Sequence, residues 1–387
     1  MSNVMHDTYT SIWNAIGIIN GTSQDEVILI GNHRDAWIIG GAADPNSGSA
    51  IMLELSKAFG ALLRTGWKPR RTIVLCSWDA EEYGLVGSTE WVEEYIPWLS
   101  RAAVSYLNID IGTAGPIPDI SATPDLHEIA LATMKKVLYT FPNNKNTTTT
   151  LYDVWQSNTQ GEIGILGSGS DYTTFLHRGI SAIDMGSYPS PTSAIYHYHS
   201  NFDSYHWMRT FGDPGFVTHK AMGQYLTLLA YHLAHDELLP LDVNTYATEL
   251  RTYFEALNKD VVALGAAAAV DLAPLDDAID VFGSAATAFM AALTSARSSS
   301  TTVGPARVQM LNAKLRDFQR AFTSQGGLPG REFYRHVVFA PGLDTGYAPV
   351  VFPGITEQLL SGDWALAEKW VGRTSRGVRE AAGILRV

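Results

Sequence analysis

Short apolar runs alternate with amphipathic segments along the first 239 residues of this chain. Five runs read as strands: residues 13–20, 26–32, 71–78, 103–111 and 180–186. Four longer segments have apolar or amphipathic patterns typical of helices: residues 47–66, 88–99, 123–141 and 216–235. Strands separated by helices of this length need crossover connections. The pattern therefore predicts an α/β fold with a mostly parallel mixed sheet covered by helices on both faces.

The pattern changes near Pro240, where strand signals vanish. Long helical patterns, rich in Ala and Leu, follow at residues 246–269, 275–296 and 307–322. Residues 295–304 are a polar connection, and a loop-rich passage over residues 327–354 precedes a final helix that starts near Asp363. We therefore predict two domains: an α/β domain over residues 1–239 and a helical bundle over residues 240–387.

Charge and hydropathy limit the partners of this chain. A net charge of −12 argues against nucleic acid as a partner. No stretch approaches the ~20 uninterrupted apolar residues of a membrane span, and the first ten residues lack a hydrophobic signal. We expect no membrane contact from this chain itself. Its single cysteine, Cys76, rules out an internal disulfide, and the sequons at Asn20 and Asn146 hint at a secretory route.

Side chains that bind metals follow the predicted strands. They are His33, Asp44, Glu82, Asp110 and His199, with Glu81 beside them. Ligands bind beyond the carboxyl ends of the strands in sheets of this kind, so these residues are expected to meet there. Zinc takes imidazole nitrogen and carboxylate oxygen. Two such ions, about 3.5–4 Å apart, can share a bridging carboxylate and a bridging water. The sequence therefore predicts a two-metal hydrolase.

The residues proposed for the first metal have a supporting carboxylate nearby. Asp35 follows His33 by two residues and is the natural partner for the other ring nitrogen of that histidine. Asp44 lies in a Gly-rich loop that enters a helix, where it could reach both metals; alone, it would read better as a helix cap. The Asp44–Pro45 bond is a candidate for the cis form. Asp110 would complete the first metal with His33.

The residues proposed for the second metal and the general base are two adjacent carboxylates and a histidine. Neighbouring residues beyond a strand end point in opposite directions, so we assign Glu82 as a ligand and Glu81 as the general base. An acidic loop is the alternative reading for this pair. His199 would complete the second metal with Glu82, and His197 is the competing candidate two residues earlier.

Longer stretches of the chain resemble one known family. They are residues 32–50, 66–91, 106–111, 166–180, 198–200 and 333–341. They are similar to the glutamate carboxypeptidase II family (prostate-specific membrane antigen and its relatives), which also includes the transferrin receptor. The likeness runs from about Trp13 to the C-terminus. It implies a zinc exopeptidase fold, followed by a helical dimerisation domain that would form a symmetric homodimer.

The resemblance also implies roles for individual residues. His33 and Asp110 would bind one zinc, Glu82 and His199 the other, with Asp44 bridging and Glu81 as general base. Tyr198 would hydrogen-bond the transition state. Glu90 and Glu93 match ligands of a structural Ca²⁺ site. Gly169, Ser170 and Tyr347 would contact the peptide substrate. Relatives work on the lumenal or extracellular side of membranes, so we expect a place in the secretory pathway, vacuolar or extracellular.

Departures from the family pattern bear on specificity. The lysine that holds a C-terminal glutamate is replaced by Gly346, and the arginine patch aligns with Asp184 and Gly186. An extra residue falls within 40–43, and the family's apical domain is missing from the matched region. Each lost charge contact is worth a few kcal/mol, so we expect no strong glutamate specificity. Aminopeptidase, carboxypeptidase and dipeptidase modes all stay open.

Two other functions compete with a dinuclear zinc exopeptidase. A non-catalytic receptor or scaffold is the first, as in the transferrin receptor branch. That branch has lost metal ligands, whereas all five candidates persist here. The second is an intact site that stays inactive, because without the apical domain the substrate is unanchored and water is poorly excluded.

Overall fold

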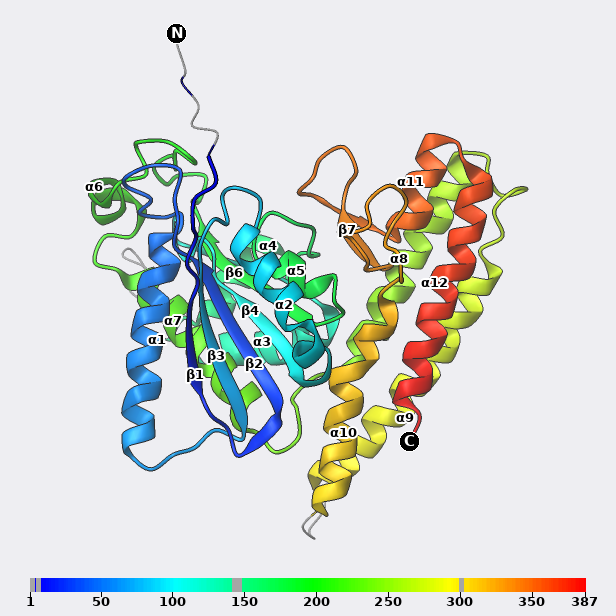
Figure 1. Ribbon diagram of the computed structural model, residues 1–387, viewed down its shortest axis with the longest axis horizontal. Coiled ribbons are helices and arrows are strands. Elements are labelled where there is room, and N and C mark those ends of the chain that lie inside the picture. The colour runs from blue at the N-terminus through cyan, green and yellow to red at the C-terminus, as the bar shows by residue number, and fades with distance from the viewer. Residues whose placement is uncertain (1–3, 5–7, 141–147, 299–302) are drawn as a thin grey trace.

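The computed structural model describes residues 4, 8–140, 148–298 and 303–387. An α/β body and a helical body lie side by side (Figure 1). The sequon at Asn146 and part of the predicted connection over residues 295–304 lie outside the described residues.

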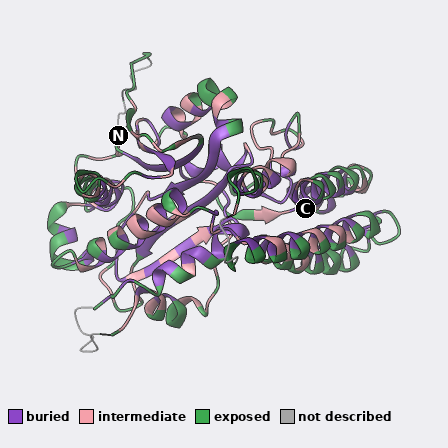
Figure 2. Ribbon diagram, turned by 90° about the horizontal axis from the view of Figure 1, so that it is seen from below, coloured by how far each residue is buried: buried purple, intermediate pink, exposed green. Residues whose placement is uncertain are grey.

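The α/β body is built on a six-stranded sheet with the order β1-β3-β2-β4-β6-β5. Its strands are β1 (Ala15–Ile19), β2 (Ser23–His33), β3 (Arg71–Trp78), β4 (Ala103–Asn108), β5 (Ile117–Ala122) and β6 (Ser181–Tyr188). The four inner strands are parallel, and β1 and β5 are antiparallel edges. The predicted mostly parallel mixed sheet is confirmed. Figure 2 shows the inner strands as mostly buried, which explains their continuous apolar runs.

Helices cover both faces of the sheet. On one face lie α1 (Asn46–Arg64) and α7 (Val217–His235), which contact each other and β2. On the other face lie α2 (Val86–Ala102) and α5 (Tyr172–Leu176), which both contact β4. Shorter helical elements lie in the connections. Between β5 and β6 are η1 (Pro124–Leu126), α3 (His127–Met134) and α4 (Leu151–Thr159), and between β6 and α7 are α6 (Tyr205–Trp207) and η2 (Met208–Gly212).

Two local predictions for the α/β body were wrong. The helix expected over residues 123–141 ends at Met134, because Tyr139 and Leu151 donate backbone hydrogen bonds to Thr149 and Val137 and pair the chain with the segment before α4. The edge strand β5 was not predicted. It contains a proline and an aspartate, and beyond β6 it pairs, among the described residues, only through a single bridge to Gly164, so its sequence lacks the apolar run of a buried strand.

The helical body contains α8 (Val243–Ala263), α9 (Ala273–Ser298), α10 (Pro305–Asp317), η3 (Phe318–Phe322), α11 (Pro353–Ser361) and α12 (Trp364–Leu385). It also holds a short hairpin of β7 (Phe339–Pro341) and β8 (Pro349–Val351), which corrects the expectation that strands end near Pro240. By length and composition α9 could cross a membrane, yet it packs against α8 and α12 and buries Phe282 and Phe289.

Buried polar contacts join the two bodies. Arg320 donates to the backbone carbonyl of Ala103 at 2.7 Å, at the start of β4. His177 of the α/β body accepts the backbone N–H groups of Arg335 and His336, each at 3.1 Å. One continuous apolar core runs through both bodies. The two bodies are therefore packed against each other through shared apolar and polar contacts.

Candidate metal centre

The candidate metal-binding side chains gather at the carboxyl edge of the sheet. His33 is the last residue of β2, and Asp110 follows the end of β4 by two residues. Glu82 lies in the turn after β3, and Asp44 in the loop that enters α1. His199 comes from the loop between β6 and α6. Because the ends of parallel strands meet at one edge, residues far apart in sequence come within reach of common points.

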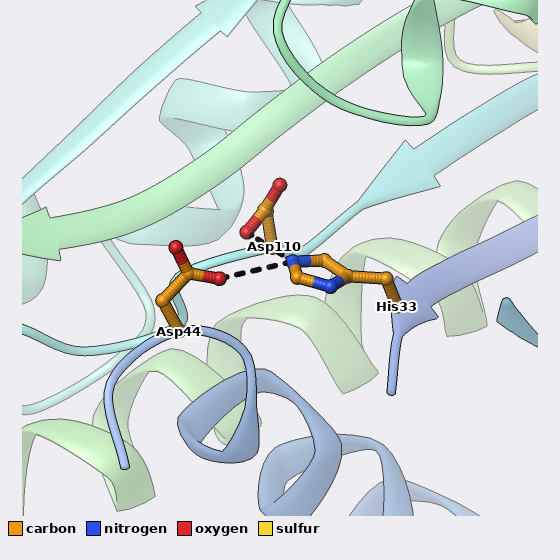
Figure 3. A group of neighbouring side chains, drawn as sticks. All are labelled: His33, Asp44 and Asp110. Carbon is orange, nitrogen blue, oxygen red and sulfur yellow. Dashed lines mark hydrogen bonds and ion pairs between the residues drawn. The ribbon is translucent and has the colours of Figure 1, made fainter. Parts of the chain in front are cut away.

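His33, Asp44 and Asp110 form the first group (Figure 3). The Nε2 atom of His33 lies 2.8 Å from Oδ1 of Asp110 and 3.1 Å from Oδ1 of Asp44. Asp44, Glu82 and His199 form the second group. Here Nε2 of His199 lies 3.1 Å from Oδ2 of Asp44 and 3.2 Å from Oε2 of Glu82. Asp44 thus presents one oxygen to each group.

The competing histidine does not join either group. His197 lies against Phe202, with ring centroids 5.4 Å apart, and belongs to neither cluster among the residues that the structure describes. His199 has a left-handed backbone, with φ of 53°, an uncommon conformation for a non-glycine residue. Strained backbone of this kind concentrates at functional sites.

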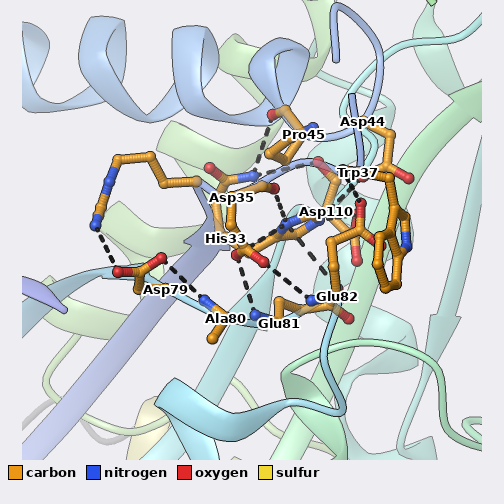
Figure 4. A network of polar contacts seen from close by, with 12 residues as sticks. His33, Asp35, Trp37, Asp44, Pro45, Asp79, Ala80, Glu81, Glu82 and Asp110 are labelled. Carbon is orange, nitrogen blue, oxygen red and sulfur yellow. Dashed lines mark hydrogen bonds and ion pairs between the residues drawn. The ribbon is translucent and has the colours of Figure 1, made fainter. Parts of the chain in front are cut away.

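Asp35 supports the site through both its backbone and its side chain (Figure 4). Its backbone carbonyl accepts from Nδ1 of His33 at 2.9 Å, while its carboxylate lies farther from that nitrogen, at 3.7 Å. The same carboxylate accepts the backbone N–H groups of Glu81 at 3.0 Å and Glu82 at 3.1 Å. Asp35 therefore ties the loop after β3 to the end of β2.

These contacts leave room for a cation at the first group. When Nδ1 of His33 donates to Asp35 in the neutral imidazole, Nε2 carries a lone pair. That lone pair faces two carboxylate oxygens, which are acceptors as well. Oδ1 of Asp44 is buried and has no hydrogen-bond partner. A cation shared by these three acceptors would satisfy all of them, so the residues fit a metal site of the nitrogen and oxygen type that zinc prefers.

Electrostatics supports the same reading. Burial, followed by the charge of Asp110, raises the pKa of Glu81 to about 10. Burial and the neighbouring Asp44 raise the pKa of Glu82 to about 7. For His33, burial lowers the pKa, but the charge of Asp110 and the hydrogen bonds to carboxylates raise it well above its usual value overall. Carboxylates packed this closely favour bound positive charge.

Two residues that position the centre were missed in the sequence. Asp203 accepts the backbone N–H groups of Ala43 at 2.7 Å and Asp44 at 3.0 Å. Asn32 donates to the backbone carbonyls of Ile109 at 2.8 Å and Asp110 at 3.2 Å. Asn32 directly precedes His33, which is a local signal, whereas nothing in the sequence near Asp203 reveals its contact with the distant loop.

A cavity of about 370 Å³ opens over the centre. Besides Glu81 and four of the five candidate ligands, its lining includes Gly169, Ser170, Asp184, Tyr188, Tyr198 and Tyr347. Gly169 has φ of +113°, and a Cβ there would lie 2.5 Å from the Tyr347 ring, so the close approach requires glycine. Asn108 donates to the buried hydroxyl of Ser170 at 2.8 Å. The residues expected at the substrate therefore share the wall of this cavity.

The two residues matched to calcium lie elsewhere. Glu90 and Glu93 are on α2, and neither belongs to a cluster of potential metal ligands in the described part of the chain. Oε1 of Glu93 lies 3.1 Å from Nη2 of Arg178, an ion pair that occupies one of its oxygens.

Comparisons with known proteins identify the family of the chain. Residues 14–210, just over half of the chain, match the model for peptidase family M28, and residues 270–386 match the transferrin receptor-like dimerisation domain. A probable glutamate carboxypeptidase of Arthroderma benhamiae is 57% identical over 386 residues, which cover 100% of this chain and 52% of that protein. The aminopeptidase NAALADL1 of Rattus norvegicus is 33% identical, over 96% of this chain and 52% of its own length.

The chain thus spans about half the length of these curated relatives. Among solved structures, a zinc aminopeptidase from Bacillus subtilis aligns with 58% of this chain and 50% of its own, at 18% identity and a TM-score of 0.41. The match over residues 14–210 decides the assignment. This chain belongs to peptidase family M28.

Proposed function

We propose that the protein is a dinuclear zinc exopeptidase that hydrolyses small peptides. One observation carries the proposal: the two carboxylate oxygens of Asp44 each lie 3.1 Å from the Nε2 atom of a different histidine, His33 and His199. A carboxylate between two such groups is the arrangement that a pair of zinc ions shares. Membership of peptidase family M28 supports the same chemistry.

Metal content tests the proposal directly. Purified protein, dialysed after incubation with zinc, should retain two ions per chain, and Asp44→Asn should lose most of both. Glu162→Gln removes an exposed carboxylate outside the cavity lining and should retain two. A wild-type protein that retains no zinc would reject the proposal and favour the receptor or scaffold alternative.

Glu81 is the residue we assign to proton transfer. Two zinc ions here would supply Lewis acidity toward the scissile carbonyl and would lower the pKa of a water molecule. Glu81 lines the cavity and is 7% exposed. Its carboxylate would take a proton from the attacking water and return it to the leaving amine. Positive charge nearby would lower the raised pKa of Glu81 and favour the ionised form that a base requires.

Tyr198 is assigned to the oxygen of the scissile carbonyl. Its side chain lines the cavity and is half exposed. Burial, followed by the charge of Asp44, raises the pKa of Tyr198 well above its usual value, so its hydroxyl keeps its proton. A protonated hydroxyl can donate a hydrogen bond to the oxygen that gains negative charge during attack.

The lining of the cavity argues against strong specificity for glutamate. None of the described residues that line it is lysine or arginine. A buried carboxylate of a substrate needs a cationic partner or several donors. Relatives are named both glutamate carboxypeptidase and aminopeptidase, so the names leave the exopeptidase mode open. A panel of dipeptides with free and blocked ends would assign it, and wild-type protein that holds zinc yet cleaves none would favour the inactive-site alternative.

Three further proposals concern assembly and surroundings. A symmetric homodimer through residues 270–386 is supported by their match to the dimerisation domain, and a monomeric mass at micromolar concentration would contradict it.

A calcium site at Glu90 and Glu93 rests on the family resemblance; unchanged thermal stability on adding calcium would count against it. A lumenal or extracellular location rests on the same resemblance, and glycosylation at Asn20 in a secreting host would support it.

A further inference from the structure

One carboxylate in the cavity has no part in the proposed metal centre or proton transfer. Asp184 lies on β6, in register with Asn108 of β4. Nδ2 of Asn108 donates to Oδ1 of Asp184 at 2.8 Å and to the hydroxyl of Ser170 at 2.8 Å. Asn108 is itself fully buried. This amide therefore fixes the Asp184 carboxylate at the cavity wall, beside a serine that also lines the cavity.

No lysine or arginine among the described residues lines the cavity beside Asp184. His199, the histidine in the described lining, is paired with Asp44 and Glu82 instead. Burial, followed by the charge of Asp110, raises the pKa of Asp184 to about 7. A carboxylate removed from water without a counter-charge attracts a cation that enters the same space.

We propose that Asp184 is a specificity-determining residue that selects substrates with a cationic nitrogen on the residue seated against β6. Two sources have this chemistry: a free α-amino group and a lysine or arginine side chain. A glutamate side chain at the same place would meet a like charge and would be disfavoured. The inference rests on the proposed exopeptidase function and adds its substrate class.

Binding of substrate-like hydroxamates to the zinc-loaded protein tests the inference without turnover. The probes are the hydroxamates of lysine, norleucine and glutamate, each with a free and an acetylated α-amino group, measured by calorimetry. Probes with a cationic nitrogen should bind about 10- to 100-fold more tightly than N-acetylnorleucine hydroxamate, because a charge-assisted hydrogen bond is worth that ratio. Comparing two probes distinguishes the two sources. N-acetyllysine hydroxamate carries only the side-chain ammonium group, and norleucine hydroxamate carries only the α-amino group.

Asp184→Asn is the matched variant, because its amide oxygen can still accept from Asn108. It should abolish the preference for cationic probes while leaving N-acetylnorleucine hydroxamate unchanged, which a merely structural role would not do. Glu162→Gln, the remote charge control, should keep the preference. Equal affinity for all probes, a preference for glutamate, or an unchanged preference in Asp184→Asn would overturn the inference alone. Failure of every probe to bind, together with absent zinc, would overturn the proposed function and the inference together.

Discussion

The carboxylate of Asp203 accepts the backbone N–H of Asp44 at 3.0 Å, and so holds the loop that carries the proposed bridging ligand. We predict that Asp203→Asn weakens zinc binding about 10- to 100-fold, because groups that orient metal ligands have effects of this size. Competition with a chromophoric chelator measures it. Asp242→Asn is the control: Asp242 likewise accepts backbone N–H groups at the start of α8, and its loss should leave zinc affinity unchanged. Equal zinc affinity in Asp203→Asn would contradict the role.

Glu81→Gln should remove turnover and spare the metal. The amide cannot accept the proton, so we expect kcat to fall on the order of 100- to 10,000-fold. Dipeptide hydrolysis and zinc content, measured on one preparation, check both halves. Glu94→Gln removes an exposed carboxylate from α2 and should behave as wild type. Activity retained in Glu81→Gln would reject the assignment.

Gly48 sets how closely α1 approaches the end of β4. A Cβ at this position would overlap the carbonyl oxygen of Ile109 and lie 2.5 Å from that of Asp110, both backbone atoms. We predict that Gly48→Ala lowers the free energy of unfolding by about 1–3 kcal/mol and weakens zinc binding. Urea denaturation and zinc titration measure the two effects.

Gly60→Ala is the matched control on the same helix. Its Cβ would meet only the flexible end of Arg64, at 3.7 Å. Alanine should therefore raise the free energy of unfolding by roughly 0.5–1 kcal/mol, through its better helix propensity. If Gly48→Ala were as stable as Gly60→Ala, the close approach of α1 to β4 would be wrong.

His336 gives the fold a pH dependence. Burial lowers the pKa of His336 from 6.5 to about 3, so it is neutral in the folded state, where its Nδ1 accepts the backbone N–H of Val338. The unfolded chain takes up the proton first, so this stability is complete above pH 6.5 and is lost as the pH falls toward 3. Between pH 7.5 and 5 the loss should be about 2 kcal/mol.

The difference between variants isolates this residue. In His336→Asn, whose side-chain oxygen can replace the accepting nitrogen, urea denaturation with chelator present should show a smaller loss between the two pH values. The exposed His206→Asn should lose as much as wild type. An unchanged pH dependence in His336→Asn would mean that His336 is not the group that titrates.

The sequence predicted the inner strands and the five metal-binding candidates for one physical reason. Strands buried on both faces leave continuous apolar runs, and a candidate ligand at the end of such a run, such as His33, must lie at the carboxyl edge of the sheet. Asp203 could not be found in this way, because its partner Asp44 is distant in sequence and the contact exists only after folding. β7 and β8 have three residues each, too few to leave a pattern, and β5 alternates buried and half-buried positions around a proline and an aspartate instead of forming an apolar run.

The β7–β8 hairpin belongs by sequence to the helical half of the chain, yet the carbonyl of Tyr347 in its loop accepts the backbone N–H of Ser168 at 3.0 Å. Tyr347 also lines the cavity over the candidate metal centre, so residues 1–239 alone would lack this part of the cavity wall. The boundary near Pro240 separates two architectures, but residues from both sides of it line the same cavity.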